Sequence, residues 1–310
     1  MEMGTIRVLD LFSGMGGFSY GFAHNGFDVT GADQSRHAEI VYRKLVSPNF
    51  INADLRREQI TGQYDIVIGG PPCKPWSPIN VSRRTTVHRD YDLVKRFADH
   101  IKTIRPEMFI LENVPALRNE LAFSEQMRSL SALGYSVETT FIKYSDYGAA
   151  TSRRRLFAVG LLNSSATEFI DGLQKHTRPG MTLRRAIEKF AENDRGTPSD
   201  HVWPELKTIS RYAEKYRTGK YGWRILDWDS PAPSFGNVMK TYILHPDSDP
   251  LDPDARVVSV LEVSRIMGFN HGFKFPDGLG VGERYQMLVD SVSPVFSDIL
   301  ARYTADHFRK

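Results

Sequence analysis

Residues 6–17 have the sequence Ile-Arg-Val-Leu-Asp-Leu-Phe-Ser-Gly-Met-Gly-Gly, and this stretch decides the fold class. The residues from Ile6 to Phe12 predict a strand. The glycines that follow predict a tight turn that opens a helix, which we expect to run to about Asn25. A strand, a glycine-rich turn and a helix in this order are typical of the first unit of an α/β domain.

Further strands and helices alternate along the first half of the chain. A second strand is expected to end near Asp33, and a helix follows over 38–45. Residues 64–68, 108–111 and 156–160 are predicted strands, with a helix expected before each of the last two. Strands separated by helices favour a doubly wound, mostly parallel sheet with helices on both faces, as in Rossmann-like folds.

The composition excludes several classes of protein. The chain has 310 residues, of which 41% are hydrophobic and 25% charged, as in ordinary globular proteins. No apolar run approaches the ~20 residues of a membrane span, and the first residues do not resemble a signal peptide. The single cysteine excludes an internal disulfide or a zinc site of several thiolates, and we expect a cytoplasmic protein. A net charge of +3 is too small to indicate a nucleic-acid partner by itself.

The composition and the apolar periodicity of the sequence change after about Ser164. Residues 170–255 are rich in Pro, Asp, Arg, Lys, Trp and Tyr and have poor periodicity, which predicts a smaller, loop-rich domain. A periodic apolar pattern returns over 257–269 and near the C-terminus. We therefore predict a catalytic and cofactor-binding domain over 1–164, completed by 281–310, and a second domain over 165–280.

Three aspartates accompany the glycine-rich turn. The turn lacks the dinucleotide-binding fingerprint, because the third glycine of that pattern would fall at Ser19. Asp10 precedes the turn and suits a cationic amine or sulfonium, Asp33 suits a ribose diol, and Asp54 suits an adenine amino group. Each aspartate alone is equally typical of a helix cap or a solvated loop. Together they indicate a nucleoside with a cationic tail and no phosphates.

The only cysteine lies in the stretch Gly69-Gly70-Pro71-Pro72-Cys73-Lys74-Pro75-Trp76-Ser77, at a predicted strand end. A lone cysteine is more often a small buried hydrophobe than a nucleophile. The proline-braced loop and the neighbouring Lys74 favour a reactive thiolate at Cys73. The basic residues that follow suit a loop that closes on a phosphate backbone, although an ordinary solvated basic loop has the same composition; they are Arg83, Arg84 and Arg89.

Two further motifs follow predicted strand ends. Glu112 comes directly after four apolar residues, so we expect it to point into the same cleft as Cys73. In an extended segment Arg153 and Arg155 share one face, and Arg154 takes the other. Two guanidinium groups on one face suit a phosphate or a base carbonyl, and the alternative is a basic patch at a strand edge.

These motifs together identify a resemblance. The ordered set Asp10–Gly17, Pro71-Pro72-Cys73, Glu112-Asn113-Val114 and Arg153–Arg155 resembles the cytosine carbon-5 DNA methyltransferases. The likeness extends from Ile6 to Gly160 and resumes at about Arg256. The four motifs are specific because they occur in the family's order and spacing. The expected activity is transfer of a methyl group from S-adenosylmethionine to carbon 5 of a flipped cytosine in a specific sequence of double-stranded DNA.

The resemblance implies roles for individual residues. It implies that Cys73 is the covalent nucleophile, that Glu112 holds and protonates the base edge, and that Arg153 and Arg155 support the flipped cytosine. The variable region over about 165–255 corresponds to the target-recognition domain, with Arg224–Ser234 as its recognition stretch. We also expect a monomer that binds double-stranded DNA and does not associate with a membrane. A companion restriction endonuclease is a further possible partner. The implied cofactor site comprises Phe12, Gly14, Gly16, Asp33, Asp54, Pro71 and Asp290.

The sequence departs from the family pattern at several positions. Thr151 replaces the usual glutamine, Leu261 replaces an arginine, and Lys74-Pro75-Trp76 replaces Gln-Pro-Phe. Val289-Asp290 replaces Gly-Asn near the C-terminus. A carboxylate at Asp290 would place negative charge beside the donor's sulfonium, and the alternative is that Asp290 caps a helix or pairs with Arg284.

Other functions compete with this interpretation. A related enzyme acting on tRNA would use the same chemistry, and the aromatic and basic variable region favours duplex DNA over it. A non-catalytic nucleic-acid-binding relative would result if the altered C-terminal motif had removed cofactor binding, but Cys73 and Glu112 argue against that. A nicotinamide-dependent oxidoreductase is disfavoured because the pyrophosphate fingerprint is missing.

Overall fold

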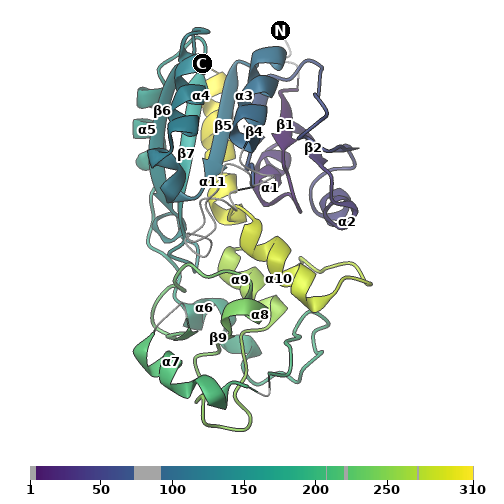
Figure 1. Cartoon of the computed structure of the whole chain (residues 1–310), viewed down its shortest axis with the longest axis vertical. Helices are drawn as coiled ribbons and strands as arrows, with labels where there is room; N and C mark the ends of the chain where they lie inside the picture. The colour runs from purple at the N-terminus through teal and green to yellow at the C-terminus, as the bar shows by residue number, and fades with distance from the viewer. Residues whose placement is uncertain (1–4, 73–91, 207, 220–222, 271, 310) are drawn as a thin grey trace. The chain divides into compact units, whose positions relative to one another are not determined.

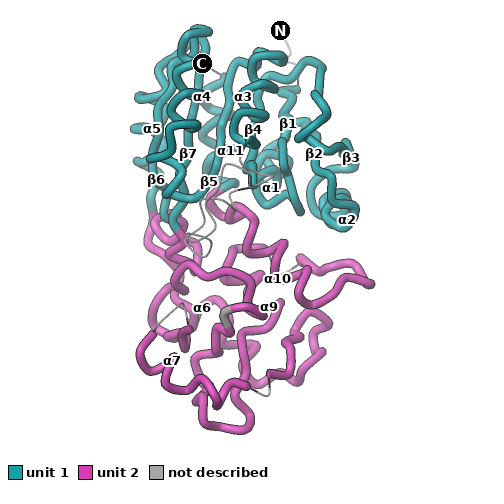
Figure 2. The backbone as a smooth tube through the Cα atoms, viewed as in Figure 1, with its two compact units in different colours: residues 1–143, 154–177, 297–310 teal, residues 144–153, 178–296 magenta. Residues whose placement is uncertain are grey.

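The chain forms two compact units, which a computed structural model describes over 5–72, 92–206, 208–219, 223–270 and 272–309. Figure 2 shows unit 1 in teal, comprising residues 1–143, 154–177 and 297–310, and unit 2 in magenta, comprising residues 144–153 and 178–296. The predicted residues Cys73, Arg83, Arg84 and Arg89 lie outside the described residues.

Unit 1 is built on a seven-stranded sheet with the order β3-β2-β1-β4-β5-β7-β6 (Figure 1). β3, β2, β1, β4 and β5 pair in parallel, whereas β7 is antiparallel to both of its neighbours. The predicted doubly wound, mostly parallel α/β fold is thereby confirmed. The strands are β1 (Arg7–Leu11), β2 (Asp28–Asp33), β3 (Phe50–Asn52), β4 (Ile66–Gly69), β5 (Met108–Asn113), β6 (Ser136–Lys143) and β7 (Arg154–Leu161).

Helices cover both faces of this sheet. On one face, Phe97 of α3 and Phe123 of α4 join the same apolar cluster as Leu9 and Leu111 of the strands. On the other face, Phe157 of β7 packs edge-on against Phe18 of α1 with ring centres 6.0 Å apart. The helices of unit 1 are α1 (Gly17–His24), α2 (Arg36–Leu45), α3 (Leu93–Ile104), η2 (Pro115–Asn119), α4 (Leu121–Ser131), α5 (Ala166–Gln174) and α11 (Pro294–Phe308).

Two details of the sheet differ from the sequence prediction. β5 continues to Asn113, so Glu112 lies within the strand rather than after it. The strand β6 precedes β7 in the chain, and only the three-residue 3-10 turn η3 (Tyr144–Asp146) lies between them, where the sequence predicted a helix. β6 was missed because most of its side chains are only half-buried at the sheet edge, so an apolar run is absent. The antiparallel pair β6–β7 therefore had no clear signal in the sequence.

Unit 2 has short elements joined by long loops, as predicted for this part of the chain. Its helix α9 (Val260–Met267) has every residue buried. α5 belongs to unit 1, although the predicted domain boundary falls before it, and the predicted functional domains stay a prediction. The other elements are η3 (Tyr144–Asp146), α6 (Leu183–Ile187), η4 (Glu188–Phe190), η5 (Ser210–Tyr212), α7 (Ala213–Thr218), β8 (Arg224–Ile225), α8 (Val238–Thr241), β9 (Ile243–Leu244) and α10 (Val281–Asp290).

No helix in the described part of the chain is both long enough and apolar enough to cross a membrane.

Candidate active site

The candidate site of unit 1 lies where the strand order of the sheet reverses. β1 is flanked by β2 on one side and by β4 on the other. The strand order therefore runs outward from β1 to β3 in one direction and from β4 to β6 in the other. In open α/β sheets, ligands bind beyond the carboxyl ends of the strands at this point. The glycine-rich turn follows β1 and Pro71 follows β4, so both lie at this edge of the sheet.

The glycine-rich turn is held by Asp33. The amide of Gly14 donates to Asp33 Oδ2 at 3.0 Å, and the amide of Ser35 donates to Oδ1 at 2.9 Å. Phe12 has a φ of 59° and Gly14 a φ of 52°, so the chain bends sharply here. A Cβ added at Gly14 would meet no atom within 4 Å, and the turn is therefore open on that side. Gly14 and Asp33 are thus in contact and Phe12 belongs to the same turn, while their role in a cofactor site stays a prediction.

The opposite side of the turn is filled by Tyr42. A Cβ at Gly16 would lie 2.7 Å from the Tyr42 ring, and a Cβ at Gly31 would lie 2.5 Å from it. The Tyr42 hydroxyl donates to Ser19 Oγ at 2.9 Å, and Ser19 Oγ donates to Asp10 Oδ2 at 2.6 Å. Gly16 therefore makes room for Tyr42 and for Val46, whose side chain would lie 2.5 Å from a Cβ there, and a buried chain of hydrogen bonds runs beneath the turn.

Asp10 is the most strongly perturbed acid of this region. Burial raises the pKa of its carboxyl to about 8, with the hydrogen bond from Ser19 opposing and the charge of Asp33 adding to the shift. Among the described residues, Asp10 Oδ1 has no hydrogen-bond partner. Burial also raises the pKa of Asp33, against the amides of Ser35 and Gly14. Asp10 is therefore protonated at neutral pH.

Glu112 and Arg155 form an ion pair at the same edge of the sheet. Arg155 Nε lies 3.0 Å from Glu112 Oε1, and Glu112 is only 8% exposed. The side-chain amide of Asn113 donates to the carbonyl of Pro71 at 2.9 Å. A Cβ at Gly70 would lie 3.2 Å from Glu112 Oε2. The segment leading to Cys73 is thus fastened next to Glu112.

Asp54 is engaged by a neighbour in the chain. Arg56 Nε donates to Asp54 Oδ1 at 2.9 Å, and this hydrogen bond lowers the pKa of the Asp54 carboxyl against a small opposing effect of burial. Asp54 therefore stays ionised and fixed, in an orientation set by Arg56.

Four other predicted residues belong to unit 2, namely Arg153, Arg224, Ser234 and Asp290. β7 begins at Arg154, so Arg153 precedes the strand, and the alternation of faces expected for 153–155 applies only from Arg154 onward. Arg153 is 7% exposed, and its guanidinium donates to the carbonyl of Phe235 at 3.4 Å. Arg224, in β8, and Ser234 are both exposed.

Asp290 is the exposed last residue of α10. The Gln286 side-chain amide donates to Asp290 Oδ2 at 2.8 Å. The alternative expectation that Arg284 pairs with Asp290 was wrong, because Arg284 instead binds Asp200 at 2.9 Å. The sequence could not predict this partner, which lies 84 positions away.

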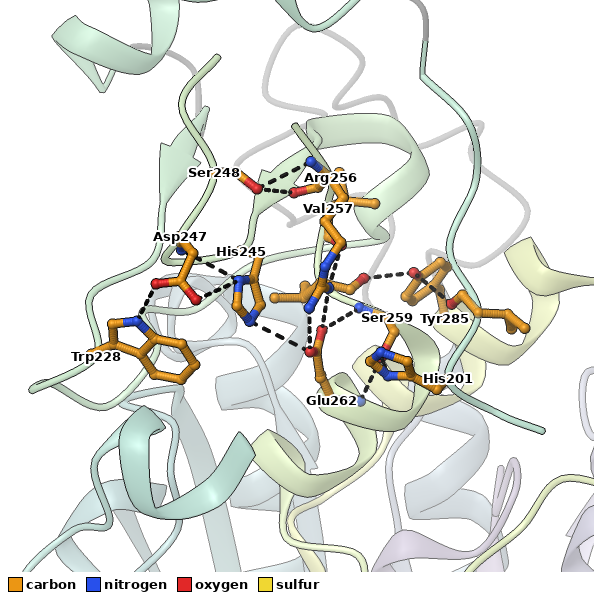
Figure 3. Close-up of polar contacts among 12 residues, drawn as sticks. His201, Trp228, His245, Asp247, Ser248, Arg256, Val257, Ser259, Glu262 and Tyr285 are labelled. Atoms are coloured by element: carbon orange, nitrogen blue, oxygen red, sulfur yellow. Dashed lines mark hydrogen bonds and ion pairs between the residues drawn. The ribbon is translucent and has the colours of Figure 1, made fainter. Parts of the chain in front are cut away.

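Unit 2 contains a buried polar network around Glu262 (Figure 3). Both Glu262 carboxylate oxygens accept from Arg256 at 2.9 Å, and the amide of Ser259 donates to Oε2 at 2.7 Å. Burial acts to raise the pKa of Glu262, but the hydrogen bonds and charge of Arg256 outweigh it and hold that pKa below its usual value. Glu262 is therefore a buried carboxylate that Arg256 compensates.

His245 connects this network to the predicted recognition stretch. Its Nε2 lies 3.5 Å from Glu262 Oε1, and its Nδ1 lies 3.7 Å from Asp247 Oδ2. Trp228 donates to Asp247 Oδ1 at 2.7 Å and packs edge-on against the His245 ring (Figure 3). Burial lowers the pKa of His245 to about 4, so the imidazole is neutral at physiological pH. The network therefore holds Trp228 against the start of α9.

Comparison with known proteins decides the family. The sequence profile of the family described as C-5 cytosine-specific DNA methylase matches residues 6–304. The chain belongs to this family.

Relatives and solved structures agree with this assignment. The chain is 26% identical to the Type II methyltransferase M.NgoPII of Neisseria gonorrhoeae, over 93% of this chain and 92% of the relative. It is 27% identical to M.FnuDI of Fusobacterium nucleatum, over 96% and 93%. In fold it resembles the Dnmt2 methyltransferase of S. pombe, with a TM-score of 0.75, 16% identity and coverage of 98% of this chain and 100% of that one.

Membership makes this protein a DNA cytosine-5 methyltransferase, an enzyme class whose methyl donor is S-adenosylmethionine. The residues of unit 1 fit such a donor. The turn is open at Gly14, and Asp33 beside it suits the hydroxyl groups of a ribose and not a phosphate, whereas the protonated Asp10 lies buried beneath the turn. The expectation of a nucleoside with a cationic tail, drawn from Asp10, Asp33 and Asp54, stays a prediction.

Sequence reasoning missed part of this site. Ser19 and Tyr42 were not singled out, since a hydroxyl on a helix carries no signal until its partner is known. Asn113 was quoted only as part of a motif, although it fastens the Pro71 carbonyl. The available signal for Tyr42 was the pair of glycines, Gly16 and Gly31, that make room for its ring.

We predict that Asp10→Asn changes how the methyltransferase's stability depends on pH. A carboxyl with a raised pKa contributes stability below pH ~4, and that contribution is lost as the pH rises through about 8. The unfolding free energy of the wild type minus that of the variant should therefore fall between pH 4 and 8, by at most about 1.4 kcal/mol per pH unit. Urea unfolding at several pH values measures this difference. A difference that stays constant with pH contradicts a buried, protonated Asp10.

We predict that Glu262→Ala destabilises the methyltransferase by about 3–5 kcal/mol, because the change leaves the partly buried Arg256 guanidinium, 13% exposed, without its carboxylate partner. The control is Glu188→Ala, which removes a carboxylate that accepts from Arg184 at 2.7 Å on the exposed surface of the same unit. The control should lose no more than about 1 kcal/mol. Urea unfolding of both variants measures the loss of unfolding free energy. Equal losses in the two variants would contradict the claim that Glu262 compensates the Arg256 charge.

Proposed function

We propose that this enzyme methylates carbon 5 of a cytosine that is flipped out of double-stranded DNA, through a covalent adduct with Cys73. The observation that carries the proposal is the buried pair of Glu112 and Arg155. It lies beside the segment Gly70–Pro72 that leads to Cys73. A carboxyl group and a thiol are the two groups that activation of a cytosine requires.

The chemistry explains why both groups are needed. Carbon 5 of cytosine is a poor nucleophile while the ring is aromatic. Addition of the Cys73 thiolate to carbon 6 breaks the aromaticity, and Glu112 assists by binding the exocyclic amine and sharing a proton with ring nitrogen 3. Carbon 5 then takes the methyl group as the donor's carbon–sulfur bond breaks. Loss of the carbon 5 proton and of the thiolate restores the ring.

Arg155 and Arg153 have supporting roles in this proposal. Arg155 holds the Glu112 carboxyl in one orientation by a 3.0 Å ion pair, which favours a fixed direction of hydrogen bonding toward the base. We assign Arg153 to the support of the flipped cytosine, as the family motif suggests. The base must leave the helical stack for any of these contacts, at a cost of a few kcal/mol.

The donor site of the proposal is S-adenosylmethionine bound at the open turn. Asp33 would accept from the ribose hydroxyls, and Phe12 and Pro71 would line the site. Bound there, the donor supplies an electrophilic methyl group on a sulfonium. The proposed donor residues are Phe12, Gly14, Gly16, Asp33, Asp54, Pro71 and Asp290.

DNA recognition is assigned to unit 2 and to the basic stretch after Cys73. Arg224 and Ser234 are exposed polar residues of the predicted recognition stretch, and they suit contacts to base edges. Arg83, Arg84 and Arg89, which lie outside the described residues, are assigned to phosphates. The relatives named above are Type II methyltransferases, which is consistent with a companion restriction endonuclease, and we propose that the enzyme acts as a monomer. The single cysteine supports a cytoplasmic location.

A trapping experiment tests the covalent mechanism. A duplex with 5-fluorocytosine at the target should form a stable covalent complex in the presence of the donor, because fluorine cannot leave as a cation. Cys73→Ala should abolish both the complex and turnover while DNA binding is kept. Glu112→Gln should keep DNA binding and lower turnover by about 10²–10⁴-fold, the range of general acid–base catalysis. Denaturing gel electrophoresis detects the complex, and a complex that persists in Cys73→Ala rules out the mechanism.

A further inference from the structure

Two arginines of unit 1 share one aromatic ring. Phe141 lies half-buried in β6, and the guanidinium carbon of Arg154 is 4.2 Å from the centre of its ring. The guanidinium carbon of Arg118, in η2, is 5.1 Å from the same ring. Attraction to the ring face holds both cations in place. Two segments far apart in the sequence therefore present two fixed positive charges together.

These two charges lack an acidic partner. Neither the Arg118 nor the Arg154 guanidinium forms an ion pair with a carboxylate in the described part of the chain, and both residues are exposed. The alternation of β6 places Phe141 and Lys143 on one face and Glu138 on the other, where Glu138 accepts from Thr167. The β6 positions on the face of Phe141 therefore carry no carboxylate, and two like charges side by side favour an anionic ligand.

The position of this pair relates it to the candidate active site. In the β5–β7 register, Asn113 lies opposite Leu156 and Glu112 opposite Phe157. Arg154 thus comes just beyond the carboxyl end of β5, next in sequence to Arg155. Arg155 pairs with Glu112 on one face of the sheet, and alternation along β7 directs Arg154 to the opposite face. The two arginines consequently stand at the catalytic edge of the sheet without belonging to the catalytic pair.

We propose that Arg118 and Arg154 bind a backbone phosphate of the DNA substrate, a role that rests on the function proposed above. Guanidinium groups make charge-assisted hydrogen bonds with phosphate oxygens. Stacking on Phe141 fixes the two groups beforehand, so little side-chain freedom is lost on binding. Contacts of this kind position a duplex and carry no sequence information.

The test compares salt dependence of DNA binding for Arg118→Gln, Arg154→Gln and the double variant. The control is Arg105→Gln, since Arg105 is an exposed arginine 5.4 Å from the Tyr135 ring in the same unit. Arg105 lies just before the amino end of β5, at the opposite edge of the sheet. Binding is measured for a duplex that the wild type methylates and for a duplex of scrambled sequence, between 50 and 200 mM salt.

Each lost phosphate contact should make the slope of log affinity against log salt shallower by about 0.9, for both duplexes. Across this fourfold change in salt, affinity should then fall about 3.5-fold less for each lost contact than in the wild type. Arg105→Gln should keep the wild-type slope. Arg118→Lys and Arg154→Lys keep the charge and should also keep the slope, which separates the loss of a phosphate contact from a folding defect.

The outcomes separate this inference from the proposed function. Unchanged slopes in both Gln variants, with a wild type that binds and methylates DNA, overturn the phosphate contact and leave the function standing. An equally shallow slope in Arg105→Gln overturns it as well. Slopes that change for a structured RNA but not for duplex DNA contradict the assignment of the partner. A wild type that neither binds nor methylates duplex DNA overturns both proposals.

Discussion

The antiparallel pairing of β5 with β7 is the constraint on which the site of unit 1 depends. In a sheet whose other neighbours along β3-β2-β1-β4-β5 run parallel, β7 is reversed, so its first residues meet the carboxyl end of β5. That reversal is what brings Arg155 within 3.0 Å of Glu112. A parallel strand in the same place would carry its first residues to the opposite edge of the sheet, and the buried Glu112 would lose its partner.

A second constraint lies beneath the glycine-rich turn. Tyr42 fills the space that Gly16 and Gly31 leave, and its hydroxyl begins the hydrogen-bonded chain to Ser19 and Asp10. The ring therefore supports the turn from below while Asp33 holds it from the side. This arrangement leaves the turn open at Gly14. Asp10 can be buried near Asp33 because the Asp10 carboxyl is neutral at physiological pH.

Much of the fold follows from local sequence patterns. The strand, turn and helix over 6–25 could be predicted because apolar residues and glycines lie in a fixed order, and β4 and β5 because each is a compact apolar run. β6 could not, because Glu138, Thr139 and Thr140 give it a polar, edge-strand character. The direction of β7 is a property of tertiary pairing and leaves no trace in its own residues.

For the candidate site, likewise, the sequence predicted individual residues but not the residues that they contact. Glu112, Arg155 and Asp33 could be found because each lies at a predicted strand end or in a family motif. Their partners could not, since Arg155 meets Glu112 across the sheet and Gly14 meets Asp33 across the turn. Arg284 was paired with the wrong acid because a sequence offers nearby partners first, whereas folding brought Asp200 to it. Long-range contacts of charged residues are thus the part that local reasoning misses.

The most direct test of the account is to identify the product of the enzyme. The purified protein is incubated with duplex DNA and S-adenosylmethionine that carries an isotopically labelled methyl group, and the DNA is digested to nucleosides and analysed by mass spectrometry. The account predicts that the label appears in 5-methyldeoxycytidine and that Glu112→Gln greatly slows its appearance. Label on an exocyclic amine of cytosine or adenine, or label only in RNA offered in parallel, would contradict the account.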